Sequence, residues 1–531
     1  MKKRIFTAHL LPLAALFGFV LAFASCANED AVQKPADANA DNDKSLTTFT
    51  AGTEPSRTSM DYTTGNYYWE SGDHIYVKDD AGVWQKSKNA PTGKTNYFKF
   101  KVPGKFGAHS SYKVYYPGKN GSNNQVNISA TQTQATPGTT DHFGTSGDCG
   151  AADAKIVSGK AGFVFTLKHQ ASILVFQPHT SDNILKNCRL TKVEVTSDND
   201  ITGTYTLDPT TGELTGTGTG KQIIITTKGS GAYADGFPLN TASASLTTNG
   251  AYMFIKPGVH RLKVRYWVKN LATGLEGTIT KAFGPFNYAR NEYNDMIGNL
   301  DIRAYNAHHY YMWDAKKNYW YGHEWDNADP WQPTLNGTTT TKHYKTEAEA
   351  PDCWSNETPG NYGTRLDATH SCATAPNVNE MAWYVEKGDP RWDDDELFSF
   401  MGHLYKGGGI WLKKKSHIPG FSTEHTPDGR DLRIENISYL DNTSWESSLP
   451  DASVAWNYFF LPALGYFYDA GIHAGLLSIG EYGSFWSSSA EPRALSVAYN
   501  FDFRRSSIRI TTGSSRVNIA YAQPFSVFGD E

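Results

Sequence analysis

Apolar and polar residues alternate over short stretches along most of this chain, and turn residues separate the stretches. Residues 163–167 and 173–175 show this alternation, and a side-chain period of two is typical of a strand with one buried face. Further stretches look like strands between Gly, Asn, Asp and Pro residues, namely 46–51, 111–116, 203–207, 251–255 and 262–268. Short strands with closely spaced turn signals predict β-sandwiches, so we expect a mainly β protein.

The pattern changes after residue 301, where tryptophans crowd together and helix signals follow. We expect no amphipathic helix longer than about two turns before residue 375. Asn377 and Glu380 have the spacing of a capping box and predict the start of a helix. The C-terminal part is therefore expected to contain helix as well as strands.

A second helix is predicted directly after the acidic run 393–396. The run would then lie at the positive end of the helix dipole, a structural explanation that we prefer to a metal site. The prediction rests on apolar residues at helical spacing, namely Leu397, Phe400, Met401 and Leu404.

The first 26 residues determine the expected compartment. A basic start precedes an apolar run over residues 5–24, and small residues lead to Cys26. This pattern indicates a secretory signal peptide with a lipoprotein cleavage site, so we expect residues 1–25 to be removed and Cys26 to carry lipid. A membrane span would need about 20 apolar residues, and Pro12 argues against that alternative.

Polar residues follow the expected lipid site. Residues 27–45 have almost no apolar content and are expected to form a disordered linker. Within this linker, residues 28–30 resemble the acidic surface-export signal of Bacteroidales lipoproteins, and an ordinary polar tether explains them equally well.

The composition fits an extracellular β protein. Aromatic residues make up 13% of the 531 residues and charged residues only 19%, a balance that favours strands. The length after processing is enough for about three or four domains. A formal net charge of -5 leaves no electrostatic footprint for nucleic acid, so no nucleic-acid partner is expected.

Four cysteines remain besides Cys26, namely Cys149, Cys188, Cys353 and Cys372. An oxidising exterior permits disulfides, and four cysteines allow three pairings. We expect a bridge between Cys353 and Cys372, which lie close together in one predicted domain, and the pairing of Cys149 and Cys188 stays open. No C-x-x-C motif or neighbouring His partner accompanies them, so we expect no metal site and no cofactor.

Residues 46–300 resemble the fimbrillin (type V pilin, Mfa-like) family of the Bacteroidales. The resemblance implies two transthyretin-like β-sandwiches in tandem, over residues 58–160 and 161–300. It rests on the lipoprotein signal, the early β segment and three motifs in this order: Ser56-Arg57-Thr58, Trp69-x-x-Gly72-Asp73-x-Ile75-x-Val77, and the strand pair over residues 163–176.

Residues 301–531 are similar to the FISUMP-type domain, which has a C-type-lectin-like α+β fold. The matching stretches are 459–466 (Phe-Phe-Leu-Pro-Ala-Leu-Gly-Tyr) and 485–489 (Phe-Trp-Ser-Ser-Ser). The last stretch, 522–528, departs from the family pattern because it lacks an arginine. In that domain class these aromatic residues belong to the core rather than to a site.

A fimbrillin with this extra domain resembles a pilus tip subunit. The resemblance implies a precursor held in the outer membrane by lipid at Cys26, which an arginine-specific protease then cuts between Arg57 and Thr58. Residues 26–57, the tether and the first strand, would leave. A strand from another pilin subunit would fill the groove and be held by main-chain hydrogen bonds. At the tip of the fimbrium, the C-terminal domain would bind a host or bacterial surface ligand, with glycans among the candidates.

Two other functions stay open. A non-polymerising cell-surface lipoprotein that binds polysaccharide or protein ligands would keep its lipid and exchange no strand. An enzyme is not expected, because Gly-x-Ser-x-Gly, His-Glu-x-x-His and P-loop patterns are absent from the sequence. The nearest enzymatic alternative, a formylglycine-generating activity on a related fold, would need free reactive cysteines.

Overall fold

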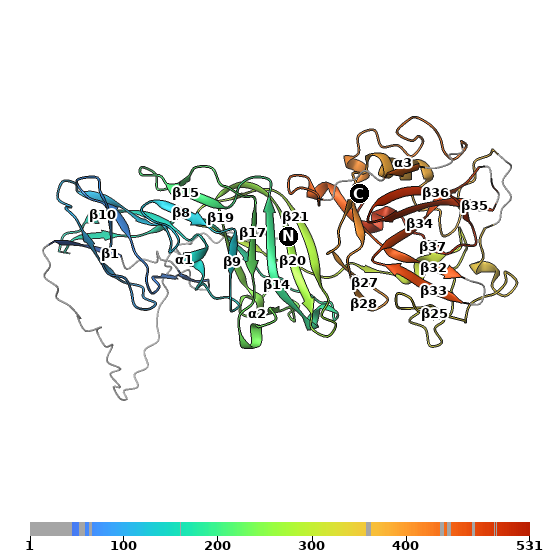
Figure 1. Ribbon diagram of the computed structural model, residues 1–531, viewed down its shortest axis with the longest axis horizontal. Helices are drawn as coiled ribbons and strands as arrows, with labels where there is room; N and C mark the ends of the chain where they lie inside the picture. The colour runs from blue at the N-terminus through green and yellow to red at the C-terminus, as the bar shows by residue number, and fades with distance from the viewer. Residues whose placement is uncertain are drawn as a thin grey trace, which may run out of the picture.

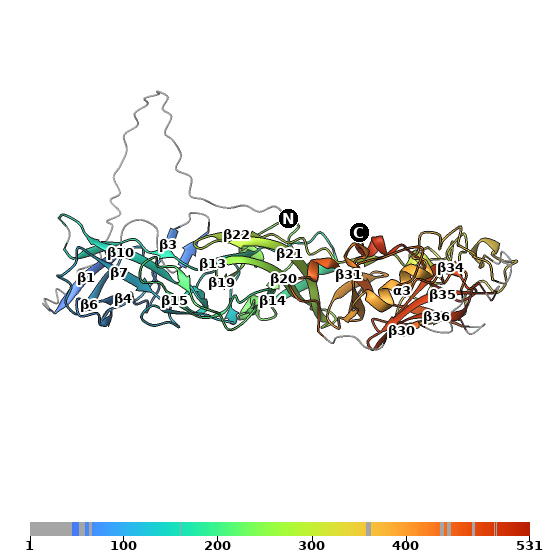
Figure 2. The ribbon, with the colours of Figure 1, turned by 90° about the horizontal axis from the view of Figure 1, so that it is seen from above.

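Three bodies rich in β-sheet lie end to end in chain order and give the molecule an elongated shape (Figures 1 and 2). The expectation of a mainly β protein is confirmed. No helix in the described ranges is long and apolar enough to cross a membrane. The computed structural model describes residues 45–51, 59–62, 66–159, 161–356, 363–435, 440–442, 448–469, 473–492, 494 and 496–530.

The first β domain is built on one large sheet, at the blue end of Figure 1. Strands that are far apart in the chain lie next to each other in this sheet, so the domain depends on long-range pairing. In spatial order the sheet contains β5 (Trp84–Lys86), β4 (Tyr76–Lys78), β7 (Ser111–Tyr116), β10 (Gly150–Ile156), β11 (Phe163–Phe165), β1 (Leu46–Ala51) and β6 (Lys99–Pro103), with β12 (Lys168–His169) beside β10.

The motif around Trp69 supplies part of the core of this domain and the turn beside it. Trp69 is fully buried, and its ring centroid lies 5.6 Å from that of Tyr116. Gly72 has a φ of +81°, which glycine adopts without strain. The buried carboxylate of Asp73 accepts hydrogen bonds from the backbone N–H of Glu70 (2.7 Å) and from the hydroxyl of Tyr116 (3.0 Å). The hydrogen bonds of Asp73 therefore hold the turn against the core.

The second β domain, green in Figure 1, surrounds a second core with three smaller sheets. Its helices α1 (Phe143–Ser146) and α2 (Leu246–Asn249) are each a single turn. The first sheet contains β19 (Ala251–Ile255), β13 (Ser172–Phe176) and β22 (Tyr293–Met296); the second contains β21 (Glu276–Tyr288), β20 (Gly258–Asn270), β14 (Cys188–Ser197), β17 (Gln222–Thr226), β9 (Thr131–Thr133) and β18 (Phe237–Pro238); the third contains β16 (Leu214–Thr215), β15 (Gly203–Leu207) and β8 (Gln125–Ile128).

The chain crosses between the two β domains more than once. β8 and β9 precede β10 of the first domain in sequence, yet they pair with β15 and β17 of the second domain. β11 follows the predicted boundary at residues 160 and 161, yet it pairs with β1 and β10 of the first domain. Strand pairing therefore crosses residues 160 and 161 in both directions, because non-local pairing decides which sheet each strand joins.

The C-terminal domain, orange and red in Figure 1, combines one large sheet with helix α3 (Val378–Lys387). The predicted capping box is confirmed: the side chain of Asn377 accepts from the N–H of Glu380 (3.0 Å), whose carboxylate accepts from the N–H of Asn377 (2.8 Å). The large sheet contains β25 (Thr339–Thr340), β33 (Ala474–Ile479), β32 (Leu464–Asp469), β34 (Tyr482–Ala490), β35 (Val497–Arg504), β36 (Ser507–Ser515) and β30 (Leu440–Asn442), with β24 (Tyr310–Tyr311) and β37 (Ala520–Tyr521) beside it. One small sheet contains β23 (Ala304–Tyr305), β27 (Leu397–Phe400) and β28 (His403–Lys406), and another contains β26 (Arg391–Trp392), β29 (Gly409–Lys413) and β31 (Tyr458–Pro462).

The second predicted helix is wrong. Its residues form the hairpin of β27 (Leu397–Phe400) and β28 (His403–Lys406). The two turn residues, Met401 and Gly402, have φ values of +48° and +72°, and this left-handed geometry suits a two-residue hairpin. The apolar residues recur at helical spacing because both faces of β27 are buried, so the strand shows no alternation.

The acidic run 393–396 lies at the junction between the second β domain and the C-terminal domain instead of preceding a helix. Arg265 of β20 donates to the carboxylate of Asp393 at 2.9 Å, and their side chains are only 8% and 1% exposed. Both the hydroxyl and the N–H of Thr280 donate to the carboxylate of Glu396, at 2.6 and 3.1 Å. Burial and the neighbouring Asp393 raise the pKa of Glu396.

Backbone contacts bring the same two domains close together. The N–H of Thr278 on β21 donates to the carbonyl of Asp395 at 2.6 Å. A Cβ atom on Gly277 would lie 2.5 Å from that carbonyl oxygen, so only glycine allows this approach. Leu397 is buried and packs with the core of the second β domain. The junction therefore joins apolar packing, a buried ion pair and a backbone hydrogen bond.

Candidate strand-exchange site

Strand β1 occupies an interior position in the sheet of the first β domain. It pairs antiparallel with β6, where Leu46 lies opposite Pro103 and Thr50 opposite Lys99. On its other side it pairs parallel with β11, where Phe49 lies opposite Phe163. Both backbone edges of β1 are therefore bonded, and its neighbours β6 and β11 meet only through it in the described sheet order.

The inner face of β1 fills a hydrophobic slot. Phe49 is fully buried, and its ring centroid lies 5.1 Å from the rings of both Phe106 and Phe163. Ala51 is also buried, whereas the first half of the strand, residues 46–48, is half-buried. Burial of one phenylalanine side chain contributes about 2–3 kcal/mol. The strand is thus held by one large side chain and by its backbone bonds.

A close backbone approach fixes one end of the slot. Gly162 has a φ of +78°, and a Cβ atom there would lie 2.2 Å from the carbonyl oxygen of Thr48. The hydroxyl of Thr48 accepts a hydrogen bond from the Nζ of Lys101 at 3.0 Å. Gly162 therefore leaves just enough room for a strand backbone in the position of β1.

The next segment of the chain is anchored elsewhere. β2 (Ser59–Asp61) and β3 (Asn66–Tyr68) form a hairpin, and the hydroxyl of Tyr62 donates to Asp295 of the second β domain at 2.5 Å. The Tyr62 ring also packs 6.1 Å from the ring of Tyr293. Burial and the Asp295 carboxylate raise the pKa of Tyr62, so the phenol stays protonated and able to donate. This hairpin has its own attachment, which does not involve β1.

The predicted processing residues, Arg57 and Thr58, lie in sequence between β1 and the hairpin of β2 and β3. These two residues and the predicted lipid site Cys26 lie outside the described residues. β1 ends at Ala51 and β2 begins at Ser59. A cut after Arg57 would therefore separate the segment that contains β1 from the hairpin.

The last described segment, residues 520–530, is packed into the core of the C-terminal domain. β37 pairs with β24 and β34. Phe525 and Phe528 are buried in the main aromatic cluster of the domain. The carboxylate of Asp530 accepts hydrogen bonds from the hydroxyl of Tyr384 and from the N–H of Lys415. The side chains of this segment, and not only its backbone, hold it in place.

The predicted bridge between Cys353 and Cys372 is not formed, and all four described cysteines are buried free thiols. Cys372 packs against Trp313 and Trp486, and its sulfur accepts from the N–H of Asp314 at 3.2 Å. Cys353 lies elsewhere, at the end of the short helix Pro351–Cys353. The two thiols are thus held in different surroundings, although they are close in sequence.

The thiols have the chemistry of buried structural residues. Burial raises the pKa of Cys353 to about 11 and that of Cys372 to about 12. A protonated thiol is a weak nucleophile, which disfavours the formylglycine-generating alternative. In the residues that the structure describes, no group of three or more His, Cys, Asp or Glu side chains could hold a metal ion.

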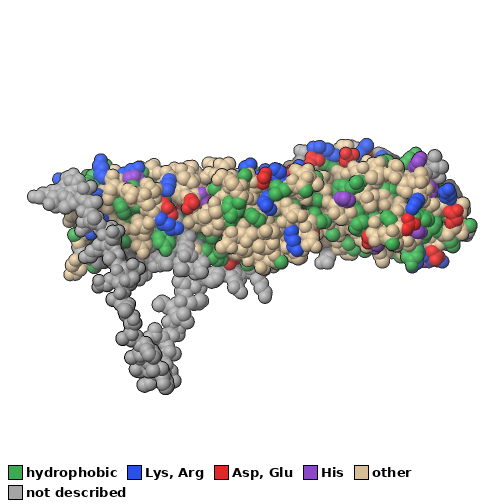
Figure 3. Space-filling view, turned by 90° about the horizontal axis from the view of Figure 1, so that it is seen from below, with side chains coloured by type: hydrophobic (Ala, Val, Ile, Leu, Met, Phe, Trp, Pro, Cys, Tyr) green, Lys and Arg blue, Asp and Glu red, His purple; other side chains and the backbone are tan. Residues whose placement is uncertain are grey.

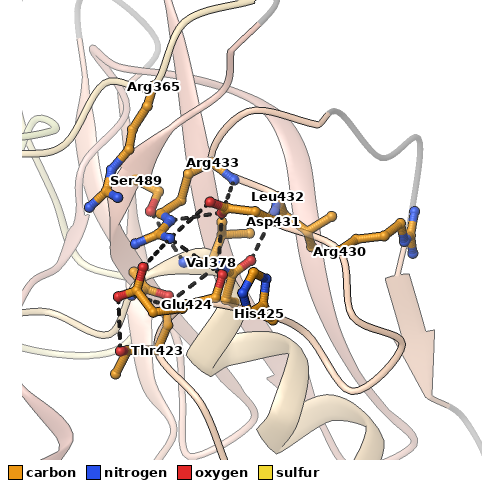
Figure 4. Close-up of polar contacts among 12 residues, drawn as sticks. Arg365, Val378, Thr423, Glu424, His425, Arg430, Asp431, Leu432, Arg433 and Ser489 are labelled. Atoms are coloured by element: carbon orange, nitrogen blue, oxygen red, sulfur yellow. Dashed lines mark hydrogen bonds and ion pairs between the residues drawn. The ribbon is translucent and has the colours of Figure 1, made fainter.

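Arg433 is the centre of a cluster of paired charges in the C-terminal domain (Figure 4). Arg433 is buried and donates to Asp431 at 2.7 Å and to Glu424 at 2.7 Å. Asn379 of α3 donates to the same Asp431 carboxylate at 2.9 Å and accepts from the N–H of Leu432. These contacts attach the loop around residue 430 to α3, so we assign the cluster a structural role.

Charged side chains are dispersed on the face of the molecule shown in Figure 3. Lys, Arg, Asp and Glu side chains occur there in small mixed groups, separated by uncharged and apolar surface. That face therefore shows no extended patch of one charge.

Comparisons with known proteins give only distant similarity. No protein-family profile matches the sequence, and no curated protein is similar to it. A candidate cell adhesion protein from Bacteroides ovatus has 14% identity and a TM-score of 0.30, and the match covers 48% of this chain and 93% of that one. The fimbrial anchor protein Mfa2 from Porphyromonas gingivalis has 11% identity and a TM-score of 0.21, over 44% of this chain and 82% of its own. A fimbrial protein from Bacteroides ovatus has 9% identity and a TM-score of 0.22, over 90% and 98%.

Such TM-scores do not establish a shared fold, so function has to be argued from the residues of this chain. Sequence reasoning found β1 and missed the features that surround it. The hydrogen bond from Tyr62 to Asp295 joins residues more than two hundred positions apart, and no local pattern predicts it. The left-handed Gly162 stands just before the Phe163 strand, and this glycine was the one local signal of a close approach.

Proposed function

We propose that this protein is a subunit of a cell-surface fimbrium, assembled by protease-triggered donor-strand exchange, with the C-terminal domain as the adhesive end at the fibre tip. One observation carries the proposal. β1 is bonded on both edges inside a sheet, and residues 52–58, which include Arg57, join it in sequence to the hairpin of β2 and β3.

Loss of β1 would create an acceptor groove. Its neighbours β6 and β11 would each expose a row of unpaired N–H and C=O groups, and the slot of Phe49 would be left empty between Phe106 and Phe163. Unpaired strand edges are templates for a foreign strand. A donor strand with a large apolar residue at the position of Phe49 would restore both kinds of contact.

The packing of residues 520–530 supports the tip position. A stalk subunit has to offer a strand to its neighbour, but in this chain the corresponding segment is buried by Phe525, Phe528 and Asp530. Such a subunit would accept a strand without donating one from this segment. This property is expected of a subunit at the end of a fibre.

The finer parts of the proposal follow the sequence resemblance. In it, the two β domains are transthyretin-like sandwiches and the last domain is C-type-lectin-like. The precursor is tethered in the outer membrane through lipid on Cys26 and is released when the chain is cut between Arg57 and Thr58. The partners are other pilin subunits and a surface ligand.

Cleavage of the purified mature chain by an arginine-specific protease tests the exchange step. A fluorescent peptide with the sequence of residues 45–51 serves as the donor strand. We expect the peptide to enter the protein only after cleavage and to displace the native segment, because the intact chain keeps β1 at a very high effective concentration. Native mass spectrometry measures both events.

The matched control is Arg57→Lys, which keeps the charge and removes the protease site. Uptake of the peptide by the uncut Arg57→Lys chain, or no uptake after complete cleavage, would contradict strand exchange. N-terminal sequencing of the surface-released protein adds an independent test. A start at Thr58 supports the proposal, and acylated Cys26 as the sole form supports the non-polymerising lipoprotein instead.

A further inference from the structure

A large pocket lies on one face of the main sheet of the C-terminal domain, along the red strands of Figure 1. Its volume is about 850 Å³, which is within the range of small-molecule sites. Side chains of β32, β34, β35 and β36 form its floor. Neither the strand-exchange site nor the junction between the domains includes these residues.

The floor of the pocket follows from the alternation of side chains along β35. Tyr499, Phe501 and Phe503 point into the aromatic core, where the ring of Phe501 lies near Tyr384 of α3. Residues between them must therefore face the opposite side of the sheet. The neighbouring strand β36 has the same arrangement. The residues that face the pocket from these two strands are Asn500, Asp502, Arg509 and Thr511.

Polar residues form a row across three adjacent strands. Asp502 lies opposite Ser484 of β34 on one side and opposite Arg509 of β36 on the other. The side-chain N–H of Asn500 donates to the hydroxyl of Ser484 at 3.0 Å, and the hydroxyl of Thr511 donates to Asp502. Cross-strand pairing thus gathers donors and acceptors at one place on the sheet.

One buried oxygen atom in this row, Oδ1 of Asn500, has no hydrogen-bond partner among the described residues, and Asn500 is only 5% exposed. The carboxylate of Asp502, which is 4% exposed, already interacts with the hydroxyl groups of Thr511, Tyr482 and Ser484. An unpaired buried acceptor costs about 1–3 kcal/mol, and native proteins retain few of them. Asn500 lines the floor of the pocket, so a ligand hydroxyl group that reaches this oxygen would supply the missing partner.

Aromatic side chains line the same pocket. Tyr466 and Tyr482 stand edge to face, with ring centroids 5.5 Å apart. Trp354 lines the pocket as well, and Tyr468 is 54% exposed at its mouth. A pyranose ring presents C–H groups on one face and hydroxyl groups at its edge, so it can pack on such rings while its hydroxyl groups reach the polar row.

The charge of the lining narrows the class of ligand. Asp502 and Arg509 are the ionisable Asp, Glu, Lys, Arg and His residues of the pocket lining, and the Nε of Arg509 lies 3.9 Å from Asp502. One cation that is already balanced by a carboxylate is a poor site for a phosphate or a polyanion. The polar floor is equally unsuited to a lipid chain.

We infer that this pocket binds a neutral carbohydrate through aromatic stacking and a hydrogen bond to Asn500. The inference rests on the proposed adhesive function of the C-terminal domain and names the class of its ligand. In this arrangement, Tyr468 covers one face of a sugar ring, and Oδ1 of Asn500 accepts a hydrogen bond from one of its hydroxyl groups.

Saturation-transfer NMR on the full mature chain tests the inference. The probes are glucose, galactose, mannose, fucose, N-acetylglucosamine and lactose, each added alone. We expect a signal from at least one of these sugars. Tyr468→Ala should weaken its binding by about tenfold or more, which corresponds to about 1.4 kcal/mol. Asn500→Ala should also weaken it, because one acceptor is lost.

Tyr321→Ala is the matched control, since Tyr321 is 49% exposed and lies outside the pocket lining. No signal from any of the sugars, or binding that Tyr468→Ala and Asn500→Ala both leave intact, would overturn the inference. Because Tyr468 is an exposed residue, its removal is not expected to unfold the domain. Sugar binding does not require cleavage after Arg57, so failure of the pocket and failure of strand exchange give different results.

Discussion

The first β domain and the C-terminal domain hold their outermost segments in opposite ways. β1 is bonded through its backbone to both neighbours, but Phe49 is its single large buried side chain. The segment 520–530 makes few strand contacts and is fixed by Phe525, Phe528 and Asp530. Main-chain hydrogen bonds can form with any strand of suitable alternation, whereas side-chain contacts require particular residues. Under the proposed strand exchange, β1 would be the replaceable segment and residues 520–530 the permanent one.

The largest effect is expected from removing the buried aromatic ring of Phe49 on β1. Phe49→Ala should destabilise the first β domain by about 3–5 kcal/mol, because a fully buried aromatic ring is lost. Hydrogen exchange should then speed up in residues 46–51. Phe525→Ala is the matched variant in the C-terminal core and should cost a similar amount without changing exchange in β1. Equal effects of both variants on β1 would contradict the proposed independence of the two ends.

The next test concerns the junction between the second β domain and the C-terminal domain. Arg265→Met should destabilise the molecule by about 3 kcal/mol, since it leaves Asp393 charged, buried and unbalanced. Chemical denaturation measures the loss. Lys269→Met on the same strand β20 is the control. Its ion pair with Asp235 is exposed, so the change should stay below about 1 kcal/mol. Similar losses in the two variants would argue against a buried pair at the junction.

The second β domain should respond to acid through His142. Burial lowers the pKa of His142 to about 4, and one ring nitrogen lies 3.0 Å from the carbonyl of Tyr252. The unfolded imidazole titrates near 6.5, so the unfolded chain takes up the proton first as the pH falls. The contribution of neutral His142 to the free energy of unfolding is therefore fully present above about pH 6.5 and is lost as the pH falls towards 4. Between pH 7 and pH 5 the free energy of unfolding should fall by about 2 kcal/mol from this group.

The variant His142→Gln keeps a hydrogen-bond donor for Tyr252 and removes the titration. Its free energy of unfolding should fall less between pH 7 and pH 5 than that of the unmodified protein. Other titrating groups are common to both chains and cancel in the difference. Identical pH dependence in the two proteins would mean that His142 is not buried in its neutral form.

The smallest effect is expected at the segment 520–530. Tyr384→Phe removes one hydrogen bond to Asp530 and should cost about 1–2 kcal/mol. Hydrogen exchange should increase in residues 520–530 and stay unchanged in residues 46–51. Tyr321→Phe, at an exposed tyrosine, is the control and should have no measurable effect. Unchanged exchange near Asp530 would show that the aromatic packing alone holds this segment.

Local features of the fold were predictable from the sequence. The strand-like stretches 46–51 and 111–116 predicted β1 and β7 with their observed bounds, and the capping box predicted the start of α3. The second predicted helix failed because β27 is buried on both faces and thus has no period of two. The turn signal of Gly402 was the evidence against that helix.

Long-range features were not predictable in this way. β1 was expected, but its partners β6 and β11 lie far along the chain, and no local pattern specifies such pairing. The carbohydrate pocket has the same origin. Ser484, Asp502 and Arg509 become neighbours only when three strands align. Each residue alone looks like an ordinary polar position on a strand.

If the molecule is attached at one end and bound to a surface at the other, as proposed, the junction has a mechanical consequence. A pull along the long axis would act on the ion pair between Arg265 and Asp393 and on the hydrogen bond from Thr278 to Asp395 at the same time. These bonds lie side by side on β20 and β21, so they would share the tension instead of breaking one after another. Rupture would then need a larger force than any one of the bonds could resist alone.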